Sequence, residues 1–498
     1  MIEIATIADK GRRKFKDVEF YDLNPSQSYC LLPFRFHRLT SSKEVLVNDI
    51  GDYLVVPEGT VENLVTRAFK KTDNEELYGD LIANFFISEG RIPELHSVIS
   101  TRYRTKKSFL DNFTSLHIFV ISLRCEHTCH YCQVSRVSQD KGAYNMSRQH
   151  IDKGIELMMR SPNSHVTMEF QGGEALLAFD NIVYAVERTK VIASQQGKTV
   201  TYVICTNLAI VTDEMLAYCK DNDILISTSL DGPSFIHNQN RHRPDNNSYE
   251  LAVAGIQKCR DILGIDRVSA LLTTTTLSLG FPNELVDEYY ALGFREIFLR
   301  PISPYGFATH NERKNKYQTD QFLEFYKKAL SRIIDYNVRG EFYREAYATI
   351  ILKKILTPFP VGYVDLQSPA GMINSVIVFN YDGKVYATDE ARMLAEMNDF
   401  TFQLGDLDTS SYEDIFYGEK AKRFAEVWSN ESLTGCSDCA FQSYCGADPV
   451  FNHATQGDMY GYRPTSSFCQ RNMEIIRYLI ELLDADKRVE KIFRSWVN

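Results

Sequence analysis

No stretch of the sequence approaches the roughly 20 consecutive apolar residues that a membrane-spanning helix needs, and residues 1–20 hold no apolar core of a secretory signal. The sequence also has fewer basic than acidic residues: 55 lysines and arginines and 65 aspartates and glutamates give a net charge of −10. Repeats of solenoid period and low-complexity linkers are absent as well. We therefore expect a cytoplasmic protein that binds neither a membrane nor a nucleic acid.

The length and composition are those of an ordinary multidomain enzyme. A chain of 498 residues is too long for one core, so two or three domains are expected. With 44% hydrophobic and 24% charged residues, long disordered tracts are not expected.

Cysteine is not scarce, and the chain contains eleven. Structural disulfides are rare in the cytoplasm, so these cysteines need another explanation. Seven fall into two groups, which are Cys125, Cys129 and Cys132, and then Cys436, Cys439, Cys445 and Cys469. The other four, interpreted as small buried hydrophobes, are Cys30, Cys205, Cys219 and Cys259.

Between residues 116 and 337, short β-branched apolar segments alternate with amphipathic helical segments. Six such strand–helix units predict an α/β fold, a partial (β/α)6 barrel, with its chemistry at the C-terminal ends of the strands. The predicted domains are residues 1–115, a barrel over 116–340 and an extension over 341–498.

The two flanking regions show simpler patterns. Residues 44–57 predict a hairpin that is followed by helices over 58–71 and 74–90, as in a small winged-helix-like module. In the extension, residues 374–390 predict a hairpin with its turn at Asp382-Gly383, and residues 472–493 predict one amphipathic helix.

The first cysteine group, Cys125-x3-Cys129-x2-Cys132, directly follows the first predicted strand. Three soft thiolates can bind three irons of a cubane cluster and leave the fourth iron open to another ligand. A zinc site completed by His127 or His130 is the alternative, and the tight loop leaves little freedom to bring in that ligand.

This motif at this place in a six-unit barrel resembles the radical S-adenosylmethionine (SAM) enzymes. The resemblance implies a [4Fe–4S] cluster held by three cysteines, with the methionine part of SAM on the open iron. It also implies reduction by a low-potential donor such as flavodoxin or ferredoxin, and a 5′-deoxyadenosyl radical that removes hydrogen from the substrate.

Residues at the later strand ends match the same family. Gly172, Gly173 and Glu174 match Gly-Gly-Glu-Pro, although the proline is Ala175 here. The resemblance assigns Ser229 and Arg241 to the carboxylate and ribose of SAM, with Asp231 shaping the loop. The full set expected around SAM is Tyr131, Gly172, Gly173, Glu174, Asn207, Ser229, Asp231 and Arg241.

The second cysteine group supplies four thiolates, which form a closed site for structural zinc or for an auxiliary [4Fe–4S] cluster. Behind a radical enzyme barrel the group resembles the SPASM extension of peptide-modifying enzymes, which favours the cluster. The four expected ligands are Cys436, Cys439, Cys445 and Cys469.

Three positions depart from a full SPASM extension, which carries two clusters. Thr388 and Pro449 stand where cysteines are expected, and the upstream ligand region has Ser368 and no cysteine. The barrel-proximal cluster is therefore expected to be missing, with an open space in its place and two clusters in total. Asp389, next to that space, is a candidate base by resemblance to sulfatase-maturing enzymes; a solvated hairpin carboxylate is the alternative.

Taken as a whole, the chain resembles the His-Xaa-Ser system radical enzyme, a maturase of ribosomally made peptides. The resemblance implies a precursor peptide with His-Xaa-Ser repeats, an oxidative cross-link, and often a second radical SAM enzyme. The hairpin over residues 44–56 is the expected edge for a leader peptide, unless the module only packs on the barrel. The alternatives are a sulfatase-type maturase that oxidises Cys or Ser, and a non-enzymatic zinc-stabilised binding protein.

Overall fold

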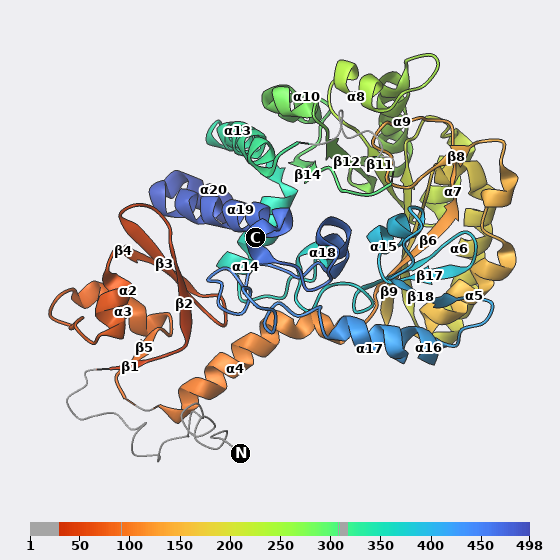
Figure 1. Ribbon diagram of the computed structural model, residues 1–498. Helices are drawn as coiled ribbons and strands as arrows, with labels where there is room; N and C mark the ends of the chain where they lie inside the picture. The colour runs from red at the N-terminus through yellow and green to blue at the C-terminus, as the bar shows by residue number, and fades with distance from the viewer. Residues whose placement is uncertain (1–28, 91, 307, 309–316) are drawn as a thin grey trace, which may run out of the picture. The chain divides into compact units, whose positions relative to one another are not determined.

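The computed structural model of the chain describes residues 29–90, 92–306, 308 and 317–498. The apolar segments of the middle region form six parallel strands, which pair in the order β14-β12-β11-β10-β9-β6 (Figure 1). The strands are β6 (Leu116–Ser122), β9 (His165–Gly172), β10 (Thr199–Thr206), β11 (Leu225–Ser229), β12 (Val268–Thr274) and β14 (Leu299–Pro301). This confirms the partial barrel.

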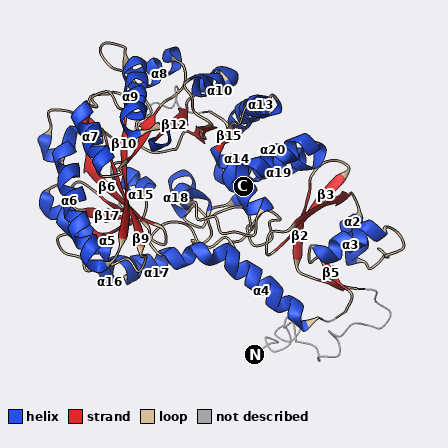
Figure 2. Ribbon diagram, turned by 180° about the vertical axis from the view of Figure 1, so that it is seen from behind, coloured by secondary structure: helices blue, strands red, loops and turns tan. Residues whose placement is uncertain are grey.

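The amphipathic segments between the strands form helices. Ser147 accepts a hydrogen bond from the backbone of His150 and starts the first of them, as an N-cap serine should. Helices α5, α6 and α7 cover one side of the sheet in both views, and α15 and α18 lie on the other side (Figures 1 and 2). The barrel helices are α5 (Arg148–Met159), α6 (Phe179–Gln196), α7 (Asp213–Asp221), α8 (Ser234–Asn240), α9 (Ser248–Leu263), α10 (Pro282–Ala291) and α13 (Thr319–Val338).

The extension continues the barrel sheet. Strand β16 (Val376–Phe379) pairs in parallel with β6, and β17 (Lys384–Tyr386) and β18 (Gln403–Asp406) follow it antiparallel. The predicted hairpin turn at Gly383 is present, with a φ of 86°. Because of this shared sheet, the barrel and the extension lie in one unit, Arg104–Asn498, and Met1–Tyr103 form a second unit.

The helices of the extension complete this unit. The sequence prediction of one C-terminal helix over 472–493 was wrong, because Asp486 takes an extended conformation (φ −140°) and caps a new helix through the backbone of Arg488. The helices are α14 (Ala346–Leu356), α15 (Asp389–Ala395), α16 (Tyr412–Tyr417), α17 (Glu419–Ala425), α18 (Pro449–Gln456), α19 (Ser467–Ala485) and α20 (Lys487–Val497).

The first unit combines a three-stranded antiparallel sheet with short helices, and β1 pairs with β5 beside them. The helix expected over 58–71 ends early, since Arg67 has a left-handed φ of 64°. The elements are β1 (Cys30–Leu31), β2 (Phe34–Arg38), β3 (Lys43–Asn48), β4 (Tyr53–Pro57), α2 (Thr60–Val65), α3 (Glu75–Ala83), β5 (Ile87–Ser88) and α4 (Pro93–Lys107), and α4 continues into the second unit.

The order of this small sheet corrects one expectation. Strand β3 lies between β2 and β4, so only the β4 half of the hairpin over 44–56 is an edge strand.

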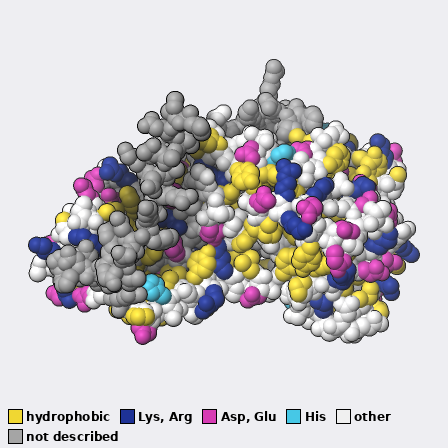
Figure 3. Space-filling view, turned by 60° about the horizontal axis from the view of Figure 1, so that its bottom comes forward, with side chains coloured by type: hydrophobic (Ala, Val, Ile, Leu, Met, Phe, Trp, Pro, Cys, Tyr) yellow, Lys and Arg dark blue, Asp and Glu magenta, His cyan; other side chains and the backbone are white. Residues whose placement is uncertain are grey.

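The described residues form no helix that is long and apolar enough to cross a membrane. On the face drawn in Figure 3, lysine and arginine side chains lie among acidic side chains and apolar side chains.

Candidate active site

The cysteine loop (residues 123–136) leaves the C-terminal end of β6. Its base is closed by β7 (Arg124–Cys125), which pairs with β8 (Val137–Ser138). Farther out, Thr128 donates its backbone N–H to the carbonyl of His242 at 2.9 Å. The side chain of His130 lies 3.2 Å from Asn240 Oδ1. The segment after β11 therefore holds the cysteine loop from the other side of the barrel mouth.

The glycines after β9 fit against the same loop. Gly172 has a φ of 153°, and a Cβ there would lie 1.9 Å from the carbonyl oxygen of Ser122. Gly173 donates its N–H to that oxygen at 2.8 Å, and a Cβ on Gly173 would lie 2.5 Å from the carbonyl of Arg124. Any side chain at these positions would push β9 away from the cysteine loop.

Glu174 is fully buried and joins the ends of β9 and β10. Its Oε1 accepts from Leu176 N and Thr206 Oγ1, and its Oε2 accepts from Asn207 N at 2.8 Å. Burial, and after it the charge of Glu126, raises the pKa of Glu174 to about 7. The carboxylate is thus mainly an internal cap, with at most one acceptor position left for another ligand.

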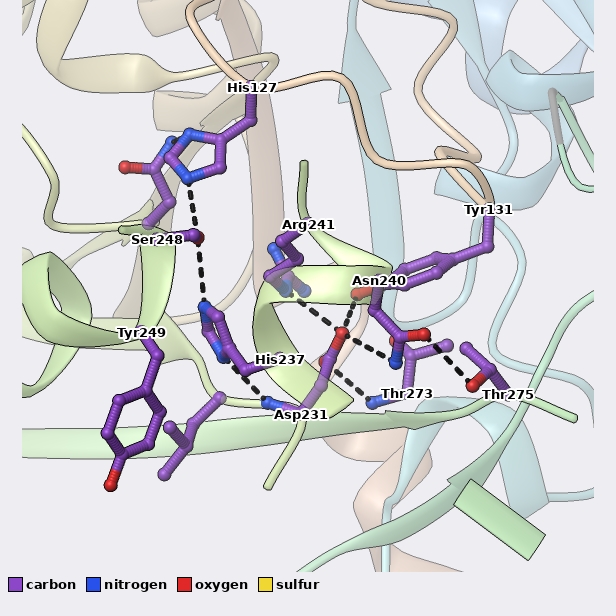
Figure 4. Close-up of polar contacts among 12 residues, drawn as sticks. His127, Tyr131, Asp231, His237, Asn240, Arg241, Ser248, Tyr249, Thr273 and Thr275 are labelled. Atoms are coloured by element: carbon purple, nitrogen blue, oxygen red, sulfur yellow. Dashed lines mark hydrogen bonds and ion pairs between the residues drawn. The ribbon is translucent and has the colours of Figure 1, made fainter. Parts of the chain in front are cut away.

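Asp231 is a second buried carboxylate, and it organises the residues expected around SAM (Figure 4). Its Oδ2 accepts from Tyr131 Oη at 2.5 Å and forms an ion pair with Arg241 Nε at 3.2 Å. The guanidinium of Arg241 also lies over the ring of Tyr131, 5.5 Å from its centroid. Ser229, the last residue of β11, is half-buried two positions before Asp231.

A chain of hydrogen bonds that was not predicted fixes both histidines next to this carboxylate (Figure 4). The backbone N–H of Asp231 donates to His237 Nδ1 at 3.2 Å, so His237 carries its proton on Nε2 and donates to Ser248 Oγ at 3.0 Å. The Ser248 hydroxyl then donates to His127 Nε2 at 2.7 Å, which leaves the proton of His127 on Nδ1, 2.9 Å from Glu126 Oε1.

This arrangement suits two neutral imidazoles. Burial lowers the pKa of His237 to about 3 and also lowers the pKa of His127. Cys125, Glu126 and His127 are close enough to hold an ion together. Both ring nitrogens of His127 already have partners, however, which disfavours the zinc site completed by this histidine. The distant partners, Ser248 above all, have no local signal in the sequence.

The donor set of the cysteine loop suits an iron–sulfur cluster. The three sulfurs come from one loop. The charge of Cys129 raises the pKa of Cys125, and the charge of Cys132 raises the pKa of Cys129. Burial raises the pKa of Cys129 to about 12, and the positive charge of bound iron would have the opposite effect on it.

The four cysteines of the extension are close enough to interact electrostatically, since the charges of Cys436 and Cys439 both raise the pKa of Cys445 and of Cys469. Cys469 occupies the first turn of α19, where its N–H is capped by Ser466 Oγ at 3.2 Å. Helix starts stabilise thiolates, which suits a metal ligand.

The three residues that stand where a full SPASM extension would have cysteines have other structural roles. Thr388 caps α15 by accepting from Ala391 N at 3.1 Å, and Pro449 begins α18. Ser368 accepts from Asn430 N at 2.9 Å and donates to Glu431. The space expected there is present, because Thr388 and Pro449 line a cavity that reaches the end of β14.

Asp389 begins α15, and its Oδ1 accepts from the buried Arg392 at 3.3 Å. The next residue, Glu390, lines the cavity. Part of the segment over residues 301–317 also lines it, through Ile302, Ser303 and Tyr305, whereas residues 307 and 309–316 lie outside the described residues.

The part of the chain that carries the cysteine loop is similar to known proteins. Residues 119–292 match the family model of the Radical SAM superfamily. The serine-type anaerobic sulfatase-maturating enzyme of Bacteroides thetaiotaomicron is 21% identical over 351 residues, which cover 66% of this chain and 80% of that protein.

Two solved structures share the fold. Native anSMEcpe with bound AdoMet has a TM-score of 0.63 at 17% identity and covers 77% of this chain and 100% of its own. Streptococcus suis SuiB bound to precursor peptide SuiA has a TM-score of 0.50 at 14% identity and covers 89% of this chain and 99% of its own. Residues 119–292 thus match the Radical SAM superfamily, a family that implies SAM and a [4Fe–4S] cluster.

Proposed function

We propose that the protein is a maturase of a ribosomally made peptide and introduces an oxidative cross-link into it. The observation that carries this proposal is the cavity between the end of β14 and the four-cysteine extension, because it gives a substrate side chain a place at the mouth of the barrel. The fold shared with SuiB, which was solved with its precursor peptide, supports a peptide as substrate.

When bound, the cluster and SAM supply a 5′-deoxyadenosyl radical that takes one hydrogen atom from the peptide. In this proposal Cys125, Cys129 and Cys132 hold the cluster. Tyr131 and Arg241, both oriented by Asp231, form the wall next to SAM, together with Ser229 and Asn207. Gly172, Gly173 and Glu174 keep β9 and β10 against the cysteine loop.

The four cysteines of the extension hold one auxiliary [4Fe–4S] cluster in this proposal. That cluster would take up the second electron of a cross-link, while a protein base accepts the proton. Asp389 remains the candidate base by resemblance, although Arg392 occupies its Oδ1. The first cluster needs an outside electron donor such as flavodoxin or ferredoxin.

The three-stranded sheet of the first unit is proposed to bind the leader peptide along an edge, and β4 is the only part of the expected hairpin over residues 44–56 that forms such an edge. Deletion of residues 1–92, which stops before α4, tests this role. Peptide binding should weaken while SAM cleavage without peptide continues; equal loss of both would make the unit structural.

The first experiment is anaerobic co-expression with the peptide encoded next to this protein, with or without the second radical SAM enzyme if one is encoded there. Loss of two hydrogens from the peptide, and no loss with Cys125→Ala, is the expected result. Fragmentation then locates the new bond. If SAM is cleaved but the mass of the peptide does not change, the assignment of this peptide as the substrate is wrong, whether or not the peptide contains His-Xaa-Ser repeats.

A sulfatase-type maturase is the second candidate, because the relative from Bacteroides thetaiotaomicron carries that name. Synthetic peptides with a sulfatase-type Cys or Ser are the test. Conversion of that residue to an aldehyde, with no reaction on the neighbouring peptide, would place this function first.

A further inference from the structure

The cavity beside Thr388 and Pro449 has about 100 Å³ of space and an unusual charge balance. Three carboxylates line it, from three different segments, and only two guanidinium groups do. The carboxylates are those of Asp365, Glu390 and Asp448, and the guanidinium groups are those of Arg300 and Arg471. No ion pair joins any of the five to another described residue. By formal count, the cavity therefore holds one carboxylate more than guanidinium groups.

Two of the carboxylates already have structural partners. Asp365 accepts a hydrogen bond from Tyr363 Oη at 2.9 Å, and Asp448 caps α18 by accepting from Phe451 N at 2.9 Å. Glu390 is the second residue of α15. The negative charges of Asp365, Asp448 and Asp389 all act on its carboxyl group. The charges of Asp365, Glu390 and Asp389 also act on Arg300 of β14.

Despite the two arginines, the pKa values of two of these carboxylates are raised. Burial raises the pKa of Glu390 to about 8, and the three neighbouring carboxylates act in the same direction. Burial also raises the pKa of Asp448 to about 6, and Asp365 adds to it. A cation in the cavity would stabilise the ionised form of both groups.

An independent observation points to a ligand in the same place. Tyr305 is 1% exposed, and its hydroxyl has no hydrogen-bond partner. Tyr305 lines the cavity, and the charges of Asp448, Glu390 and Asp365 are close enough to raise the pKa of its hydroxyl. A buried hydroxyl without a partner is unfavourable, so a ligand with an N–H group would supply what the protein does not.

The remaining wall suits the stem of a long side chain. Tyr347 and Tyr363 line the cavity with their rings edge to face, 6.5 Å between centroids. Aromatic rings pack against methylene groups and attract a cation at their faces.

We infer that this cavity binds the cationic side chain of a lysine or arginine in the substrate peptide. Glu390 and Asp448 are its counter-ions, and Tyr305 Oη accepts one of its N–H groups. The inference rests on the proposed function, because it takes the substrate to be a peptide.

The test measures binding to the full-length holoenzyme under anaerobic conditions in the presence of SAM. The probes are four acetylated tripeptide amides in which lysine, arginine, norleucine or glutamate stands between two glycines. The lysine and arginine probes should bind about tenfold tighter than the other two. Equal binding of lysine and norleucine, or tighter binding of glutamate, would overturn the inference.

Variants locate the effect. Glu390→Gln should remove most of the advantage of the cationic probes, and Glu419→Gln, an identical change at a side chain that is 91% exposed, should leave it intact. Tyr305→Phe removes one oxygen and keeps the ring, and it should weaken the cationic probes about two- to fivefold. If both cavity variants behave like Glu419→Gln, the cavity is not the site.

Free amines separate the sources of the cation. If n-butylamine or spermidine binds as tightly as the lysine probe, the cavity takes a free amine and the peptide assignment is wrong. These measurements need no turnover, so they give an answer even if the co-expressed peptide is left unmodified and the proposed function fails.

Discussion

The cysteine loop and the four cysteines of the extension belong to one unit but are anchored in different ways. The cysteine loop depends on distant residues, since Tyr131 binds Asp231 and Thr128 binds the backbone of His242. Cys439 and Cys445 of the extension lie in local turns, in which Cys439 N donates to the Cys436 carbonyl at 3.0 Å and Cys445 N to the Phe441 carbonyl at 3.1 Å, and Lys354 Nζ adds one distant contact with the Cys445 carbonyl at 3.3 Å. Damage far from the sulfurs should therefore affect the first group more than the second.

The largest expected difference comes from removing one ligand in each group. Cys125→Ala should abolish SAM cleavage, and Cys436→Ala should leave cleavage without peptide in place. Each variant should lose about four irons of a total of about eight, because each group is proposed to hold one [4Fe–4S] cluster. Iron analysis and 5′-deoxyadenosine formation are the measurements.

Two outcomes would change this view. SAM cleavage that survives Cys125→Ala would contradict the assignment of the cysteine loop. A wild-type total near twelve irons would show a third cluster, despite Thr388, Pro449 and Ser368.

The next effect concerns the anchor of the cysteine loop. Asp231→Asn leaves Arg241 as a buried charge without its carboxylate, which should cost about 3–5 kcal/mol locally and lower the thermal midpoint of the holoenzyme. SAM cleavage should fall as well. Asp408→Asn is the matched control, because Asp408 pairs with Lys153 at the surface, where water screens the ion pair, and the change should have little effect on the midpoint. Equal midpoints for the two variants would mean that Asp231 is not an anchor.

A smaller loss is expected from the histidine chain. Ser248→Ala removes the hydroxyl that joins His127 to His237 and leaves two buried ring nitrogens without partners, at a cost of about 1–3 kcal/mol. Thermal denaturation measures the loss. Ser495→Ala, at an exposed hydroxyl near the C-terminus, should have little effect. If Ser248→Ala is also silent, the chain of hydrogen bonds does not support the cysteine loop.

The buried carboxyl group of Glu345, which joins the barrel to the extension, should make the stability of the protein depend on pH. Glu345 is fully buried and accepts from Leu299 N of the barrel, from Tyr326 Oη and from Ala348 N of the extension. Burial raises its pKa from 4.5 to about 7. The folded protein then binds more protons than the unfolded chain, so this contribution to stability is complete below about pH 4.5 and is lost as the pH rises to about 7.

Glu345→Gln should flatten the decline of the thermal midpoint over that pH window. The comparison is between the slopes of wild type and variant, measured in the same buffers. Identical slopes would assign the pH dependence to other groups.

Many of the strands, helices and turns could be predicted from the sequence, because the patterns that indicate them are local. The six strands, the N-cap at Ser147 and the turn at Gly383 follow from alternation, capping and turn chemistry. The C-terminal helix was predicted as one piece, since its apolar face continues through Asp486 and only the backbone there departs from the helix.

The contacts that organise the candidate site were not predictable in the same way. His127 and Ser248 lie 121 positions apart, and Tyr131 and Asp231 lie 100 apart. Such pairs depend on how the strand ends meet, which no local pattern records. The sequence analysis placed Asp389 next to the open space and did not name Glu390, which lines the cavity. Which of the two side chains points there depends on where α15 begins.

The parallel pairing of β16 with β6 has a consequence for how the protein can be divided. Strand β6, which leads into the cysteine loop, has hydrogen-bonded neighbours on both sides, β9 and β16. Truncation before the extension would leave one side of this apolar strand with open N–H and C=O groups, a surface that invites intermolecular strand addition and precipitation. A shortened protein that ends after α13 would therefore be a poor substitute for the whole enzyme in solution experiments.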